Sequence, residues 1–382
     1  KKASTYAASV SRTTHKARRF YSSGAPQHFW LRHEVKPSEA RSALLPEHVK
    51  QLQNAGHKVT VEKSSVRCVP DSAYEAVGAE MAETATWEQS PADAVVIGLK
   101  ELPEEPPKLI HNHIYFGHAY KGQGDGPALM KRFKNGGGKL WDLEYLVHEN
   151  GKRVAAFGKS AGIAGAAMGI KTWAHQRLTG FKDPLPSHHN VTYNTLDLLA
   201  KDVGDMITKA KVNPPKVLVI GALGRSGSGA CEFSEMVPGV EVTKWDIAET
   251  KSEDVASAIR SHDIFINCVF VDSPMAKPFI TMDQLKQGPN QLSVVADVSC
   301  DANNVNNPIP IYKEYTEFSK PTRRILDGEK PIDIVAIDHL PSLIPEVSSR
   351  EFGDAMMKYY LDFPTSDVWQ RSNLVFNKHV ND

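Results

Sequence analysis

Residues 216–230 read KVLVIGALGRSGSGA, and this stretch decides the fold. Its first five residues form a compact β-branched run that predicts a buried strand. The next ten carry glycines at Gly221, Gly224 and Gly227, a GxxGxxG pattern typical of the turn from a strand into a dinucleotide-binding helix. Glycine there permits a tight turn and a close approach of the backbone to a pyrophosphate, whose charge the helix N-terminus stabilises.

A second predicted strand, residues 240–246 (VEVTKWD), ends in the acid that this pattern requires. Asp246 lies roughly 20 residues beyond Gly224, as in dinucleotide-binding units. A carboxylate there binds the ribose hydroxyls and repels a 2′-phosphate, so we expect NAD rather than NADP as the cofactor. The alternative is a glycine turn that serves packing alone, which the order of strand, glycines, helix and acid disfavours.

Further apolar runs alternate with helical patterns along the chain, which predicts parallel α/β sheets. The other predicted strands are 29–34, 58–62, 94–98, 113–116, 263–270, 293–298 and 334–338. Helical patterns cover 38–41, 47–55 and 127–134, and the Gly- and Ala-rich residues 154–170 are typical of a helix packed very close to its neighbours. In such sheets ligands lie at the carboxyl ends of the strands.

Length and composition favour two domains and exclude several classes of function. The chain has 382 residues, 41% of them hydrophobic, and its 45 basic residues balance its 45 acidic ones, which disfavours nucleic acid or an acidic membrane surface as partner. Its four cysteines form no CxxC pair, so we expect neither a metal site nor a disulfide framework. No apolar run approaches the roughly 20 residues of a membrane-spanning helix.

Residues 1–28 form a basic leader that differs from the rest of the chain. Seven Lys and Arg residues and many hydroxyl residues precede Glu34, the first acid. Such Arg- and Ser-rich, acid-free leaders are typical of mitochondrial transit peptides, and residues 19–23 (RFYSS) resemble a matrix-processing site. The sequence therefore predicts the mitochondrial matrix. The alternative is a basic tail without an address, on a cytoplasmic protein.

Eight separate segments of the sequence together identify a protein family far more specifically than a dinucleotide-binding pattern does. They are 32–41 (RHEVKPSEAR), 97–101 (IGLKE), 116–121 (FGHAYK), 142–146 (DLEYL), 153–158 (RVAAFG), 221–229, 244–247 (KWDI) and 337–343 (IDHLPSL). Through them the chain resembles the NAD-dependent, lysine-forming saccharopine dehydrogenases of fungal type, in the group that includes alanine dehydrogenase and transhydrogenase. The resemblance begins near Leu31, so the basic leader lies outside it.

The resemblance implies an α/β fold of two Rossmann-like, doubly wound parallel-sheet domains with the active site in the cleft between them. Residues 29–158 with 346–382 would form the N-terminal substrate and catalytic domain, which a helix over 349–363 completes. Residues 159–345 would form the NAD-binding domain.

The implied activity is that of an oxidoreductase acting on a CH–NH group. Saccharopine, NAD and water would give lysine, 2-oxoglutarate and NADH, the last step of the aminoadipate route of lysine biosynthesis. The family's two acid/base residues fall on Lys100 and His118. An imidazole with a pKa of about 6.5 suits proton transfer near neutrality, whereas a lysine at about 10.4 must first be perturbed by burial or by cations such as Lys36 and Lys121.

The family's binding positions can be carried over residue by residue. Saccharopine is a tricarboxylate, which guanidinium groups bind through paired hydrogen bonds. The substrate-binding positions would be Arg41, Gln123, Arg153 and Phe157, with Glu101 and Glu144 setting the charge state of the acid/base pair and binding the ammonium groups of lysine. The cofactor-binding positions would be Lys152, Gly221, Gly224, Arg225, Gly227, Asp246, Thr250, Phe270, Val298, Ile337, Asp338, His339 and Leu340.

Two other functions stay open at this point. One is an alanine dehydrogenase-like activity on a small 2-oxo acid, which would need fewer arginines in the cleft than a tricarboxylate does. The other is a non-catalytic accessory subunit of a mitochondrial assembly, because a fold does not by itself imply a catalytic function. The set of Lys100, His118, Arg41, Arg153 and Asp246 argues against the second, since a chain freed from catalysis has no physical need for all of them.

Overall fold

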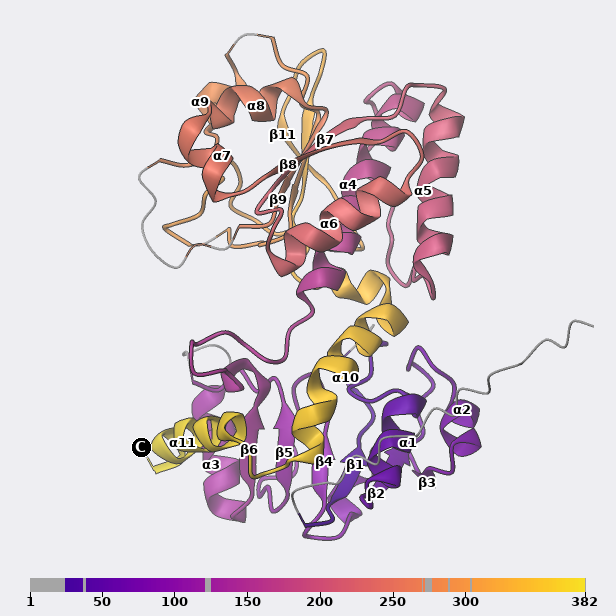
Figure 1. Cartoon of the computed structure of the whole chain (residues 1–382), viewed down its shortest axis with the longest axis vertical. Coiled ribbons are helices and arrows are strands. Elements are labelled where there is room, and N and C mark those ends of the chain that lie inside the picture. Colours follow the sequence, from indigo (N-terminus) through magenta and orange to yellow (C-terminus); the bar gives the residue numbers. More distant parts are fainter. Residues whose placement is uncertain are drawn as a thin grey trace, which may run out of the picture.

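A computed structural model describes most of the chain and divides it into two lobes. The described residues are 25–36, 39–120, 125–269, 271, 277–287, 289–302 and 304–381. The two lobes lie one above the other, each around a six-stranded sheet (Figure 1). The leader up to residue 24, Lys121, Gln123 and Phe270 lie outside the described residues.

The sheet of the first lobe is entirely parallel, in the order β3-β2-β1-β4-β5-β6. Its strands are β1 (His28–Leu31), β2 (Lys58–Glu62), β3 (Glu80–Ala82), β4 (Val95–Ile97), β5 (Asn112–Tyr115) and β6 (Lys139–Asp142). The strand order reverses between β1 and β4, where Leu31 pairs with Ile97. The loops that leave these two strands therefore start side by side, at the crevice where doubly wound sheets bind ligands.

Helices from both ends of the described chain complete the first lobe. They are α1 (Pro46–Asn54), α2 (Asp71–Ala76), α3 (Gly126–Gly136), α10 (Pro345–Leu361) and α11 (Asp367–Asn381), with the short helices η1 (Trp87–Gln89) and η2 (Leu143–Tyr145). The C-terminal helix α11 packs on β6 and α3, where the fully buried Trp369 meets Trp141 edge to face at 5.8 Å. The first core is thus closed by residues far away in sequence.

The helix predicted at 38–41 is wrong over residues 39–41, and residue 38 lies outside the described residues. Residues 39–41 are irregular, because the Glu39 carboxylate accepts a hydrogen bond from the backbone N–H of Arg41 at 3.0 Å. Such local bonds from a side chain to the backbone offer the chain an alternative to the helix.

The second sheet has the order β11-β12-β10-β9-β7-β8 and is parallel except for β11. Its strands are β7 (Lys216–Ile220), β8 (Glu241–Trp245), β9 (Ile264–Asn267), β10 (Val294–Asp297), β11 (Arg323–Leu326) and β12 (Ile332–Val335). The predicted parallel strands are confirmed, with small shifts of their ends. No apolar pattern predicted β11, which is an antiparallel edge strand with two arginines and no fully buried residue.

Helix α4 (Gly158–Thr179) is the central helix of the second lobe. It packs against α5 (Leu196–Ala210), α6 (Arg225–Met236) and the strands β9 and β10, which confirms the closely packed helix predicted from the Gly- and Ala-rich segment. The other helices are α7 (Ile247–Ser252), α8 (Val255–Ser261), α9 (Met282–Leu285) and η3 (Leu340–Leu343). Within the described ranges, no helix combines the length and the apolar character needed to cross a membrane.

The chain passes between the lobes twice, just before α4 and into α10. Phe157 stacks on Phe352 of α10 at 5.1 Å with nearly parallel rings. Glu351 of α10 accepts hydrogen bonds from the first N–H groups of α4, at Lys159 (3.0 Å) and Ser160 (2.9 Å). A carboxylate at a helix N-terminus satisfies unpaired donors and the helix dipole together. The two crossings are therefore bonded to each other, while the domain limits given above stay a prediction.

His113 on β5 is a polar residue inside the first core. It is fully buried, edge to face with Trp87 and Phe133, and neither ring nitrogen has a hydrogen-bond partner among the described residues. Burial, helped by the charge of Arg32, lowers its pKa well below the ordinary value. Below the ordinary imidazole pKa, the unfolded chain therefore binds a proton at His113 that the folded chain does not bind. The free energy of unfolding falls as the pH is lowered through this range.

We expect His113→Phe to make the protein less sensitive to acid. As the pH falls from 6.5 to 5, keeping this imidazole neutral lowers the free energy of unfolding of the wild type by up to about 2 kcal/mol. The variant has no imidazole at this position, so its free energy of unfolding should not fall for this reason. Urea denaturation at pH 7.5 and pH 5 measures this loss. The exposed His189→Gln is the control, and an equal loss in His113→Phe and the wild type would contradict the role given to burial.

Candidate functional site

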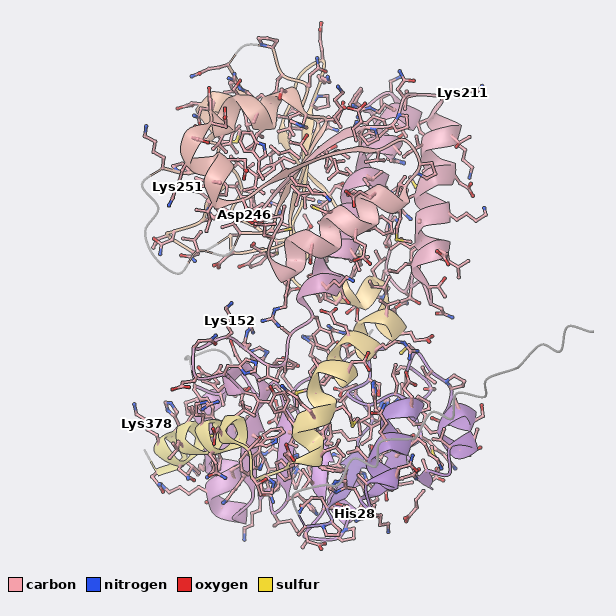
Figure 2. All side chains as sticks on the ribbon, in the orientation of Figure 1. His28, Lys152, Lys211, Asp246, Lys251 and Lys378 are labelled. Atoms are coloured by element: carbon pink, nitrogen blue, oxygen red, sulfur yellow. The ribbon has the colours of Figure 1, made fainter. Side chains whose placement is uncertain are left out.

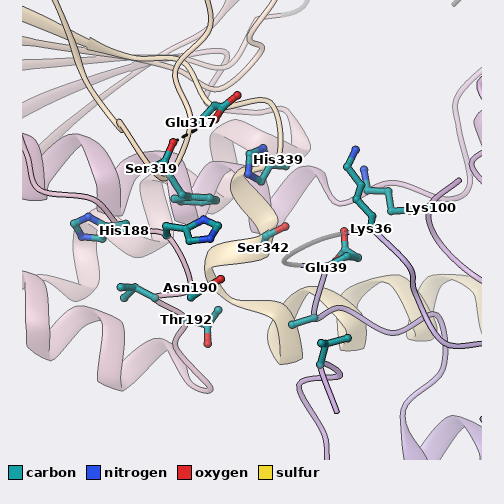
Figure 3. Close-up of a pocket in the computed structure, with 15 residues that line it drawn as sticks. Lys36, Glu39, Lys100, His188, Asn190, Thr192, Glu317, Ser319, His339 and Ser342 are labelled. Carbon is teal, nitrogen blue, oxygen red and sulfur yellow. Dashed lines mark hydrogen bonds between the residues drawn. The ribbon is translucent and has the colours of Figure 1, made fainter. Parts of the chain in front are cut away.

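A cavity of about 580 Å³ lies between the two lobes. The first lobe contributes Lys36, Glu39 and Lys100, and the second contributes residues 188–192, residues 317–319, His339 and Ser342. Figure 3 shows the two lysines on one side of the pocket and His188, Asn190 and Ser319 on the other. The cavity lies at the carboxyl ends of β1 and β4, as the reversal of strand order requires.

Lys100 follows β4 and brings its amino group into this cavity. Burial lowers its pKa from the usual value, and the positive charge of Arg41 lowers it further. Lys36 acts in the same direction, as the sequence suggested, whereas Glu39 and Glu101 oppose it. A lysine whose pKa is lowered by burial and by neighbouring cations can exist in its neutral, proton-accepting form nearer to neutral pH.

Arg41 is 4% exposed, and its guanidinium group is already oriented by two neighbours. Nε donates to one carboxylate oxygen of Glu39 at 2.8 Å and a terminal nitrogen donates to the other at 2.6 Å. The group lies over the ring of Phe157 at 4.5 Å, a cation–π contact. Burial alone would raise the pKa of Glu39, but the charge and hydrogen bonds of Arg41 lower it. Arg41 is not among the residues that line the cavity between the lobes, so its role in binding a substrate carboxylate stays a prediction.

His118 follows β5, the strand next to β4, and has a positive φ of 48°. Residues other than glycine rarely have a positive φ, and those that do are concentrated at functional sites. Its Nδ1 is 3.1 Å from a carboxylate oxygen of Glu144, a bond that raises the pKa of His118 although burial opposes the rise. Asp142 accepts hydrogen bonds from the N–H groups of Gly117 and Glu144 and so connects the two loops.

Lys100 and His118 leave the same edge of the sheet but differ in surroundings. His118 has a 38% exposed side chain and is not among the residues that line the cavity. Glu101 connects them electrostatically, because its charge raises the pKa of both Lys100 and His118. It also pairs with Lys36 at 3.8 Å on the surface.

A second cavity, of about 950 Å³, lies beside the glycine turn of the second lobe. Three predicted cofactor positions line it, Gly221, Asp246 and Thr250. Gly221 directly follows the strand β7 and has a φ of 87°, which a residue with a side chain rarely adopts. A Cβ on Gly227 would lie 2.6 Å from the carbonyl carbon of Gly221, so only glycine lets α6 begin this close to the turn.

Asp246 directly precedes α7 as its N-cap residue and lines the second cavity. One oxygen accepts from the N–H of Ile247 and the other from the N–H of Leu223, both at 2.9 Å. These two residues expose large apolar side chains beside the carboxylate, at 86% for Leu223 and 65% for Ile247. A carboxylate has further lone pairs for ribose hydroxyls, and apolar flanks suit an adenine ring. The residues present therefore fit a dinucleotide.

Arg225 and Arg153 meet across the gap between the lobes. Arg225 begins α6, and its guanidinium donates to the backbone carbonyl of Arg153 at 3.1 Å. The Arg153 side chain is exposed, as is Lys152, which Figure 2 shows on the first lobe at the edge that faces the second. None of these three residues is among those that line the cavity between the lobes, so their predicted roles in binding stay predictions.

The remaining predicted cofactor residues follow the strands β10 and β12. Val298 is half-buried against α4, and the side chains of Ile337 and Leu340 are buried in the core, so a cofactor would meet those two through their backbone. Asp338 bonds the ring of His339 at 2.6 Å, which lowers the pKa of Asp338. The charges of Lys100 and Lys36 act on it in the same direction, from the other lobe.

Several residues of the site carried no signal that sequence reasoning used. Glu39 pairs with Arg41, Asp142 connects the two loops, and the loops 188–192 and 317–319 form the second-lobe wall. Short polar loops without periodicity cannot be placed from the sequence alone. Among the described residues, no group of His, Cys, Asp or Glu is arranged to bind a metal ion.

Comparison with known proteins places this architecture in a family. Residues 30–164 match the model of the alanine dehydrogenase/PNT N-terminal domain. A solved L-alanine dehydrogenase has the same fold, with a TM-score of 0.62 at 15% identity, over 92% of this chain and 94% of the other.

Curated relatives are far closer in sequence. The chain is 43% identical to "Saccharopine dehydrogenase [NAD(+), L-lysine-forming]" of Yarrowia lipolytica, over 93% of this chain and 98% of that protein. It is 41% identical to the protein of the same name in Schizosaccharomyces pombe, over 92% and 98%. With such identity over nearly its whole length, the chain belongs to the family of NAD(+)-dependent, L-lysine-forming saccharopine dehydrogenases.

Proposed function

We propose that the protein catalyses the NAD-dependent oxidative cleavage of saccharopine to L-lysine and 2-oxoglutarate, and the reverse reductive condensation. The observation that carries the proposal is Lys100, whose pKa is lowered and whose amino group enters the cavity between the lobes. The family of the chain and the second cavity beside the glycine turn support it.

The second lobe would bind NAD. Gly221, Asp246 and Thr250 would hold the adenosine part, and the first N–H groups of α6 would bind the pyrophosphate. When bound, NAD supplies the acceptor for the two electrons that leave the C–N carbon of saccharopine. Because the carboxylate of Asp246 repels a 2′-phosphate, NADP should serve poorly.

Two proton transfers then fall to the first lobe. Neutral Lys100 would take the proton from the secondary amine, and His118, held by Glu144, would take a proton from the water that adds to the imine carbon. Collapse of the resulting carbinolamine breaks the C–N bond, so the nitrogen leaves on lysine and the carbon becomes the 2-oxo group. Arg41 and Arg153 would bind carboxylates of the substrate.

The relatives' names favour this reaction over an alanine dehydrogenase-like activity or a role as accessory subunit. The association with a mitochondrial assembly stays a prediction that no comparison supports.

Replacing Lys100 by Met should slow turnover roughly 10²- to 10⁴-fold without loss of cofactor binding. A positioned base contributes roughly 10²- to 10⁴-fold to the rate, and methionine cannot accept a proton. NADH absorbance, with saccharopine and NAD or NADP, measures turnover, and NADH fluorescence titration measures binding. The exposed Lys58→Met is the matched control. Full activity in Lys100→Met would remove this residue from the mechanism.

The Glu144→Gln variant should move the pH profile of kcat/KM toward lower pH. The hydrogen bond to Glu144 is the first cause of the raised pKa of His118, so its loss lets that pKa fall. Where unprotonated His118 is the base, the rising limb of the profile follows the same shift. The exposed Glu149→Gln should leave the limb unmoved, and an unmoved limb in Glu144→Gln would refute the pairing.

We further propose that residues 1–28 direct the protein to mitochondria, which rests on their Arg- and Ser-rich, acid-free composition. A fluorescent protein fused behind residues 1–33 should colocalise with a mitochondrial dye. The same fusion with Arg12, Arg18 and Arg19 replaced by Gln should stay in the cytosol. A cytosolic signal from both fusions would support the alternative of a tail without an address.

A further inference from the structure

We propose that Arg32 and Glu34 form a buried ion pair that positions Lys100 for proton transfer. The inference rests on the proposed function, because it assigns a role to the surroundings of the proposed base. Neither side chain lines the cavity between the lobes, so both are positioning residues rather than catalytic ones.

Glu34 binds the backbone at the exit of β4. One carboxylate oxygen accepts the N–H of Leu99 at 2.6 Å, and the other accepts the N–H of Lys100 at 3.0 Å. The carboxylate is 7% exposed, so water cannot readily replace these two bonds. It reaches them from the loop after β1, 65 and 66 residues earlier in the sequence.

Arg32 completes the arrangement from the same loop. Its guanidinium is 3.3 Å from the Glu34 carboxylate, is 2% exposed, and donates to the carbonyl of Lys100. It also lies over the ring of Tyr115, 5.7 Å from the centroid. Both backbone polar groups of Lys100 are therefore bound by one ion pair, its N–H by Glu34 and its carbonyl by Arg32.

The absence of a side chain at Gly98 leaves room for the guanidinium of Arg32. A Cβ at this position would lie 2.6 Å from Cζ of Arg32 and 2.7 Å from one terminal nitrogen, closer than real Cβ contacts. The guanidinium is itself held on its other sides by Glu34 and the carbonyl of His33. A side chain at residue 98 would therefore displace Arg32 or shift the chain that leads to Lys100.

The fixed backbone determines where the amino group of Lys100 lies relative to its charged neighbours. Those that face it are Lys36, Glu39, Arg41 and Glu101 from the first lobe, with His188, His339, Glu317 and Asp338 across the cleft. Burial is the first cause of its lowered pKa, so a Lys100 that moves toward solvent should regain a higher one.

The test uses two variants of the full chain that disturb the arrangement by different means. Glu34→Gln removes the charge and one of the two backbone acceptors, whereas Gly98→Ala keeps every charge and displaces the guanidinium. The control is Asp333→Asn, which removes the charge of a buried carboxylate that pairs with the partly exposed Arg324 (2.6 Å) at the amino end of β12, away from the cleft. All three should lower the melting temperature.

Only Glu34→Gln and Gly98→Ala should slow the reaction. We expect kcat with saccharopine to fall roughly 10- to 100-fold, as for a misplaced catalytic group, with KM for NAD unchanged. The pKa of Lys100 should rise in both, read from the NMR signal of the ¹³C-dimethylated side chain, which Lys100→Arg identifies. Asp333→Asn should keep the wild-type kcat and the wild-type pKa.

A melting temperature lowered as in the control, with kcat and the Lys100 pKa of the wild type, would overturn the inference and leave the pair a purely structural one. If Glu34→Gln does not fold, Gly98→Ala decides by the same measurements. A wild type inactive on saccharopine would instead refute the proposed function. The NMR titration needs no turnover, so it would then still decide whether the ion pair sets the environment of Lys100.

Discussion

Parallel strands deliver their carboxyl ends to one edge of a sheet, and in this protein the edges of two such sheets face each other. In the first lobe the order of the strands reverses between β1 and β4, so the loops behind them separate and leave a crevice. The second lobe reverses its order between β7 and β9, beside the glycine turn. Both cavities follow from these two reversals, and so does the meeting of residues from distant parts of the chain.

The charges of the cleft balance one another in pairs rather than singly. Arg41 lowers the pKa of Lys100 and is itself neutralised by Glu39, so a cation is present beside a base without an unpaired charge in the interior. The pKa of His118 moves in the opposite direction, because Glu144 raises it. Two groups whose ordinary pKa values differ by about four units are thereby drawn toward each other, as suits two acid/base residues that share one substrate.

The sequence predicted most of what local patterns encode. The glycine turn, Asp246 at the end of the next strand and the closely packed α4 all leave periodic or positional signals. It could not predict contacts such as that between Glu34 and Leu99, because a single buried acid looks like any surface acid until the fold brings two distant loops together. For the same reason the edge strand β11 and the wall formed by residues 188–192 were missed. The predicted roles of the individual site residues stay predictions.

The first lobe is assembled from the beginning and the end of the described chain, whereas the second is one continuous segment. During synthesis the second lobe has all its strands and helices before α11 is made, and it can fold while the first lobe is still incomplete. Until then Trp141 lacks Trp369, and the edge strand β6 lacks its cover. A ribosome that pauses late would therefore expose a sheet edge and an aromatic surface, the species on which chaperones act.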